Sequence, residues 1–424
     1  MFDVEKIVKA NCPDGYKIID KKTSAHEMFF VVGRKVETVR ASETEDTSVS
    51  VYVKNEDGTM GGSKFPVYSS MDEEALKREL TKALVRAKLA HNPPFELVEG
   101  GKEDYEIKSD LKGLNGREVA EKVAKAVYDA KMVEGGSINA LEIFVTESTT
   151  RVRLSTGLDK TQTGYKIGIE AIPTHTDAKE SVELYEWYEL TSLNLADITR
   201  EISDKMREVK DRHEAVKGEP QVVDVALRAN EISELADNLA YELSYGAKYM
   251  HRNAFEVGED LQKGRTGDPL TVTMKAAVEG SSHSAAFDED GTTLKDRVVI
   301  KDGKAVALWG GSIFGQYLGE KKEDITGDLG CISVESGSLD KVGGRYLEAV
   351  SLSGIQLDTY NDYIGGEIRL AYLHDGDKVT PVTGISMSGK LSEVLPSLRL
   401  TADKVVRGAY EGPSLMLLKN MQIV

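Results

Sequence analysis

Three consecutive carboxylates, Asp288, Glu289 and Asp290, are followed by Gly291, a residue typical of tight turns. Adjacent like charges repel one another, so this acidic turn is either spread in water or arranged to receive a cationic group. A solvated turn is the ordinary interpretation, and a contact with a peptide or a protein partner is the functional one. The residues alone leave both open.

A β-hairpin is predicted directly after the acidic turn. Residues 297–300 and 305–309 are β-prone runs, and Asp302-Gly303 between them supplies the positive φ angles of a two-residue turn. Gly310-Gly311 then leads to a short segment that ends at Tyr317-Leu318-Gly319. Arg297 opens the hairpin, and Tyr317 stands near the end of the whole block.

This order of residues resembles the signature of the TldD/PmbA family, whose members are called modulators of DNA gyrase or peptide-maturation metalloproteases. Two further blocks, residues 366–391 and Gly412-Pro413-Ser414-Leu415, are similar to that family's C-terminal strands and its closing motif. The three blocks come in the family's order and cover the C-terminal half. The resemblance makes six residues candidates for peptide or partner binding: Asp288, Glu289, Asp290, Gly291, Arg297 and Tyr317.

The zinc motif of the TldD branch is missing from this sequence. The resemblance implies His-Glu-x-x-x-His on the first helix of the last domain, but residues 230–244 contain no histidine. The family's third ligand, a cysteine, would fall near Val406, Arg407 or Gly408, none of which binds metal. Since catalytic zinc needs three protein ligands and a carboxylate base, we expect no metal, no other cofactor and no catalytic residue. The sequence therefore resembles the PmbA (TldE) branch.

Net charge, cysteine count and the lack of long apolar runs restrict the binding partners and the cellular compartment that this protein can have. The formal net charge of −17 opposes direct binding of nucleic acid, which requires clustered Lys and Arg. Two cysteines, Cys12 and Cys331, exclude a disulfide framework and indicate a reducing compartment. We find no signal peptide and no apolar run long enough for a membrane span, and therefore expect a cytoplasmic protein.

The length of 424 residues exceeds the roughly 250–300 residues over which one core keeps growing, so several domains are expected. The pattern predicts an α+β fold with two small N-terminal α/β units, residues 1–100 and 105–217. A strand-rich domain of mixed and antiparallel strands, residues 220–424, follows them. This domain should begin with a strand at 222–227 and an amphipathic helix from Asn230 to about Met250.

Three functions agree with these observations. The leading hypothesis is a non-catalytic subunit or pseudo-enzyme that acts beside a TldD-type zinc subunit in the processing or degradation of small peptides. The alternative is a free-standing homodimer that binds peptides or a protein partner without hydrolysis. The third, a hydrolase with unrecognised residues, has the least support.

A dimer is expected for a second reason. Residues 305–309 carry no charge and residues 415–418 are large and apolar. As unprotected strand edges, both would need a subunit to cover them.

Overall fold

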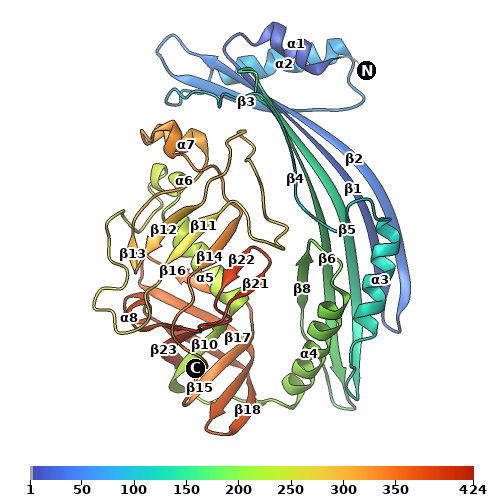
Figure 1. Ribbon diagram of the computed structural model, residues 1–424, viewed down its shortest axis with the longest axis vertical. Coiled ribbons are helices and arrows are strands. Elements are labelled where there is room, and N and C mark those ends of the chain that lie inside the picture. Colours follow the sequence, from blue (N-terminus) through green and yellow to red (C-terminus); the bar gives the residue numbers. More distant parts are fainter. Residues whose placement is uncertain (1–2) are drawn as a thin grey trace.

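The computed structural model describes residues 3–424, and the chain forms two halves that lie side by side (Figure 1). One long curved sheet carries the N-terminal half, whereas shorter strands and helices build the C-terminal half. The prediction of an α+β fold with a strand-rich C-terminal region is confirmed.

The N-terminal sheet has eight strands in the order β3-β2-β1-β5-β6-β4, and β7 and β8 also pair with β6. Successive side chains along each strand point to opposite faces of the sheet. Neighbouring strands are antiparallel except for β4, which runs parallel to β6. Strands of both predicted N-terminal units therefore share one sheet, while the boundaries proposed at 100–105 and 217–220 stay a prediction. The strands are β1 (Tyr16–Val31), β2 (Lys35–Lys54), β3 (Met60–Val67), β4 (Lys102–Glu106), β5 (Gly136–Leu154), β6 (Asp159–Thr176), β7 (Ser181–Glu183) and β8 (Glu186–Leu190).

Two pairs of helices pack on this sheet. Helices α1 (Val4–Asn11) and α2 (Glu73–Ala87) cover one end of it through a core with β1, β2 and β3. Helices α3 (Gly116–Tyr128) and α4 (Leu195–Glu214) pack against β1, β5 and β6. Asp72, Asn115 and Asn194 cap α2, α3 and α4 with their side chains, which satisfies backbone N–H groups in the first turn.

The C-terminal half contains two sheets. The larger one follows β15-β10-β23-β19-β17-β18-β9, and a further pairing of β15 with β17 closes its first five strands into a ring. The smaller one follows β13-β12-β11-β14-β22-β21. Their strands are β9 (Val216–Lys217), β10 (Gln221–Arg228), β11 (Val272–Lys275), β12 (Arg297–Lys301), β13 (Lys304–Ala305), β14 (Cys331–Val334), β15 (Tyr346–Leu352), β16 (Gln356–Asp358), β17 (Tyr363–Asp375), β18 (Lys378–Thr383), β19 (Ile385–Gly389), β20 (Arg399–Leu400), β21 (Val405–Arg407), β22 (Tyr410–Gly412) and β23 (Leu415–Ile423).

Helix α5 (Ala229–Tyr241) follows β10 directly and buries its apolar face in the core of the C-terminal half. The prediction of a single helix from Asn230 to about Met250 is wrong, because α5 ends at Tyr241 and a separate helix, α6 (Tyr245–Tyr249), follows. The Ser244 hydroxyl accepts a hydrogen bond from the backbone N–H of Ala247 and begins α6. The remaining helices are α7 (Ser312–Tyr317), the short η1 (Lys322–Asp324) and α8 (Leu391–Ser397).

The hairpin turn at Asp302-Gly303 is confirmed, with φ angles of 50° and 86° at its two turn residues. Its second strand, β13, ends at Ala305, so the strand predicted over residues 305–309 is wrong beyond that residue. The prediction that residues 305–309 and 415–418 form unprotected strand edges is wrong. Strand β23 pairs with β10 on one side and with β19 and β20 on the other, so residues 415–418 lie inside the sheet. Ala305 is buried, and the Trp309 indole N–H donates to the Ala240 carbonyl. This chain thus covers residues 415–418 and buries Ala305, while Val306 stays 42% exposed. A dimer stays a prediction.

Candidate functional site

The acidic turn lies at a contact between the two halves of the chain. Lys17 Nζ is 2.5 Å from Asp290 Oδ1, and Lys21 Nζ is 2.6 Å from Glu289 Oε1. Both lysines lie on β1, more than 260 residues before their partners in the sequence. The cations that meet this turn are therefore groups of the same chain.

Asp288 is the buried member of the turn, with 8% of its surface exposed. One carboxylate oxygen accepts from the backbone N–H groups of Asp290 and Thr292, both at 2.9 Å, and the other accepts from Asp328 N–H at 3.1 Å. Burial, and then the nearby charge of Asp290, raise the pKa of Asp288 to about 6. Gly291 has φ 80°, a conformation that side-chain-bearing residues seldom adopt, so the turn requires glycine here.

The other two predicted residues lie elsewhere. Arg297 donates to the backbone carbonyl of Asp324. Tyr317 packs on Phe95 and Tyr249, with ring centroids 6.2 and 5.0 Å apart. A small cleft of about 340 Å³ is lined by Asp288 and Glu289 but includes neither Arg297 nor Tyr317. The structure thus brings Asp288 to Gly291 together at one contact, and a shared role of all six residues stays a prediction.

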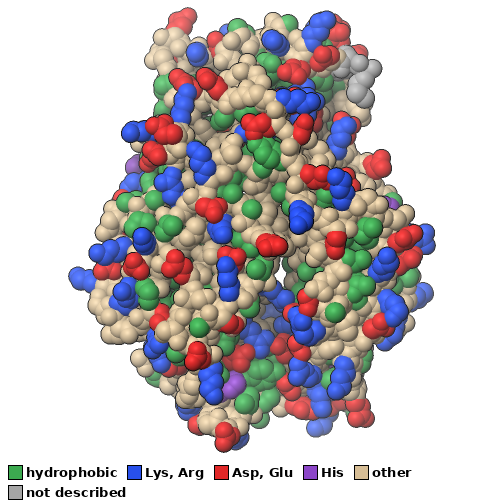
Figure 2. Space-filling view, viewed as in Figure 1, with side chains coloured by type: hydrophobic (Ala, Val, Ile, Leu, Met, Phe, Trp, Pro, Cys, Tyr) green, Lys and Arg blue, Asp and Glu red, His purple; other side chains and the backbone are tan. Residues whose placement is uncertain are grey.

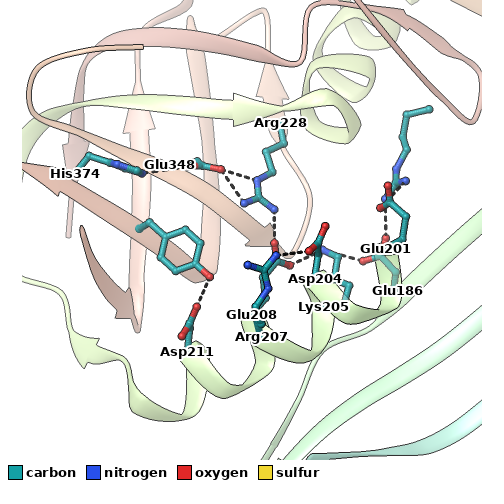
Figure 3. A network of polar contacts seen from close by, with 12 residues as sticks. Glu186, Glu201, Asp204, Lys205, Arg207, Glu208, Asp211, Arg228, Glu348 and His374 are labelled. Carbon is teal, nitrogen blue, oxygen red and sulfur yellow. Dashed lines mark hydrogen bonds and ion pairs between the residues drawn. The ribbon is translucent and has the colours of Figure 1, made fainter. Parts of the chain in front are cut away.

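A larger cleft, of about 980 Å³, separates α4 from the C-terminal half. Its walls come from α4, the start of α5 and the segment 405–407, with β15 and β17 at one side. Figure 2 shows it as a hollow between the two halves in the lower part of the view, with side chains of both charge signs at its walls. Figure 3 shows the polar network that fills it.

Lys205 and Arg228 form the centre of this network. Lys205 Nζ lies 2.9 Å from a carboxylate oxygen of Glu186 and 2.9 Å from one of Glu208 (Figure 3). Arg228 reaches Glu208 at 2.6 Å and Glu348 at 2.7 Å. Burial alone would lower the pKa of Lys205, but the two carboxylates raise it, so the lysine stays charged.

Arg407 extends the network toward the C-terminal end of the chain. Its guanidinium is 3.2 Å from Glu186 and 3.0 Å from Glu201, and it lies 4.8 Å above the Tyr188 ring. Arginine suits this place, because its planar guanidinium can bind carboxylates and lie over an aromatic ring at once.

Glu231, in the first turn of α5, differs from the other acids of the cleft. Burial raises its pKa to about 7, although Lys205 and Arg228 oppose the shift. A carboxyl group that titrates near neutral pH within a cleft is typical of functional sites and can exchange a proton there. The sequence analysis did not single out Glu231, and its only signal was its place on the helix where the resemblance expects a zinc motif.

The residues of the cleft do not fit zinc. Zinc sites use His, Cys, Asp or Glu donors, and in this cleft Glu186, Glu201, Glu208 and Glu348 are already paired with Lys or Arg. Within residues 3–424, no three His, Cys, Asp or Glu side chains are grouped so that they could hold a metal ion. In the same part of the chain, no helix is long and apolar enough to cross a membrane.

By sequence, no protein-family model matches the chain, and neither does any curated protein. Solved structures do match it. TldE from Thermococcus kodakarensis superposes with a TM-score of 0.81 at 15% identity, over 99% of this chain and 98% of that one. Two proteins described as putative modulators of DNA gyrase also match at 14% identity. The one from Bacteroides thetaiotaomicron has a TM-score of 0.81 and coverage of 99% and 97%. The one from Thermotoga maritima has 0.76, with 99% of both chains covered. The resemblance seen in the sequence is thus confirmed at the level of fold: along nearly its whole length, this chain has the fold of TldE and of these two proteins.

Proposed function

We propose that this chain is a TldE-like subunit that carries no catalytic zinc and acts beside a TldD-type, zinc-bearing subunit in the processing or degradation of peptides. The likeness to TldE over almost the whole of both chains supports the proposal. The family resemblance of the sequence supplies the partner and the peptide substrates.

One observation carries the non-catalytic role. The resemblance assigns zinc binding to two separate segments, the first helix of the last domain and the residues near 406–408. In this structure, the start of α5 and residues 405–407 line the same cleft. They bring Asn230, Glu231 and Arg407 to it, and Arg407 is held by two carboxylates. A guanidinium stands where a metal ligand would be expected, and its positive charge disfavours a metal cation nearby.

Equilibrium dialysis against zinc, combined with affinity purification of the tagged full-length chain, tests the proposal. We expect less than stoichiometric zinc on this chain and co-purification of a homologous chain that contains His-Glu-x-x-x-His. About one zinc per chain, retained after dialysis and lost on substitution of residues in this cleft, would contradict the non-catalytic role. A homodimer that binds peptides and never takes up such a partner would support the alternative function.

A further inference from the structure

One face of the N-terminal sheet, opposite α3 and α4, presents aromatic and acidic side chains together. Along β5, β6 and β8, Ile143, Ile169 and Tyr188 point toward the helices and are buried. The residues between them point the other way. Strand register sets Phe29, Glu142, Glu170 and Trp187 directly opposite one another in a row across four strands.

Aromatic rings flank the two carboxylates of this row. Phe144 lies between Phe29 and Trp187, with ring centroids 5.7 and 6.1 Å away. Trp187 is 37% exposed and its neighbour Tyr185 is 56% exposed. A Cβ at Gly168 would stand 2.9 Å from the Trp187 ring, so glycine lets the indole lie across β6. We call the surface formed by Phe29, Glu142, Phe144, Glu170, Tyr185 and Trp187 the aromatic-acidic face.

The two carboxylates at its centre are cross-strand neighbours of like charge. Glu142 and Glu170 are directly paired in the β5–β6 register, and among residues 3–424 neither is within 4.0 Å of a Lys or Arg nitrogen. Directly opposed like charges destabilise a sheet, and a bound cation would relieve that repulsion. Burial, followed by the charge of Glu170, raises the pKa of Glu142, which agrees with such strain.

The same surface already holds one cationic group of this chain. Arg40 donates to Glu27 at 2.6 Å while its guanidinium lies 5.7 Å from the centre of the Phe29 ring. Carboxylates with aromatic rings nearby are the combination that recognises ammonium and guanidinium groups. Arg40 uses this combination at Glu27 and Phe29, whereas Glu142 and Glu170 have no Lys or Arg partner among residues 3–424, and the Tyr185 hydroxyl contacts Glu170.

We propose that the aromatic-acidic face binds an extended polypeptide segment through a Lys or Arg side chain placed between Glu142 and Glu170 and against the rings of Phe144 and Trp187. The inference rests on the proposed function, which it deepens by naming basic peptides as the ligand class. Binding to this chain alone is measured, so its failure is distinct from a failure of hydrolysis with a partner subunit.

Calorimetric titration at low salt with a short peptide of alternating Lys and Thr tests the proposal, and the same peptide with Gln in place of Lys serves as the neutral probe. The full-length chain should bind the Lys peptide at least tenfold more tightly than the Gln peptide, because each lost charge-assisted hydrogen bond contributes more than about 1.4 kcal/mol, which is tenfold in affinity. The double variant Glu142→Gln, Glu170→Gln should weaken binding of the Lys peptide at least tenfold.

The matched control is Glu43→Gln, Glu147→Gln. Both residues align with Ser24 on the opposite face of the same sheet, so this variant changes the net charge equally. It should bind the Lys peptide as the unaltered chain does. Equal weakening in the two double variants would show attraction by net charge alone and would overturn the proposal. Equal binding of the Lys and Gln peptides by the unaltered chain would overturn it too, whether or not any variant folds.

Discussion

The pH dependence of stability isolates the contribution of Asp288, the buried carboxylate of the acidic turn. Its pKa is about 6 in the folded chain against an ordinary value of 3.8. Between these values the folded chain holds more protons on Asp288 than the unfolded chain does. The stability contributed by Asp288 is therefore fully present below about pH 3.8 and is lost as the pH rises through about 6.

The size of this effect follows from the shift. A difference of about two pKa units corresponds to about 3 kcal/mol over the full range, of which about 2 kcal/mol falls between about pH 4 and about pH 7. Other groups also titrate in this range, so the free energy of unfolding of the unaltered chain alone does not report on Asp288. The difference between the unaltered chain and Asp288→Asn does, because asparagine carries no charge at any of these pH values.

Urea denaturation of both proteins at several pH values provides the measurement. The free energy of unfolding of the unaltered chain should fall by about 2 kcal/mol relative to that of Asp288→Asn as the pH rises from about 4 to about 7. A difference that stays constant with pH would show that Asp288 titrates normally in the folded chain. The account of a desolvated carboxylate in this turn would then be wrong.

Three further predictions concern charged side chains. Glu231→Gln should raise the free energy of unfolding by up to about 3 kcal/mol at about pH 8 and leave it unchanged at about pH 4, because burial raises the pKa of this carboxyl from 4.5 to about 7. The same difference between variant and unaltered chain in urea denaturation at both pH values would contradict this. Lys17→Met leaves the partly buried Asp290 carboxylate without its partner, so it should lower the free energy of unfolding by about 3 kcal/mol in thermal denaturation. Lys21→Met removes the exposed pair with Glu289 in the same turn and should cost under about 1 kcal/mol. Equal losses in the two variants would refute the distinction. Arg407→Ala should cost about 2–3 kcal/mol in urea denaturation, since Glu186 and Glu201 each lose one cationic partner while Lys205 stays at Glu186. Arg200→Ala, at an exposed pair of α4, should cost under about 1 kcal/mol, and an equally small loss at Arg407 would show that the cleft network is not stabilising.

Local patterns were predictable from the sequence, because turn chemistry acts between neighbouring residues. Asp302-Gly303 needs two positive φ angles and has them. The break between α5 and α6 has a local signal in the sequence, because Ser244 is a good N-cap, although the apolar spacing continues past it. For residues 415–418, an uninterrupted apolar run is typical of a strand buried on both faces, which is where β23 lies.

Contacts between distant segments could not be predicted in this way. The acidic turn was expected either to lie in water or to receive a cation, but only the register of β1 reveals that Lys17 and Lys21 reach it. The cleft likewise depends on α4 facing residues 405–407, which are about two hundred positions away in sequence. Lys205, Arg228 and Glu231 belong to no motif of their own, so they were identified only from the structure.

The most direct test of the proposed function is hydrolysis of an unstructured peptide by three preparations: this chain with added zinc, a TldD-type chain that carries His-Glu-x-x-x-His, and an equimolar mixture of the two. The account predicts no cleavage by this chain alone and cleavage by the mixture that exceeds that of the zinc-bearing chain, with full loss on chelation of the metal. Zinc-dependent cleavage by this chain alone would contradict it, and so would a mixture no more active than the zinc-bearing chain.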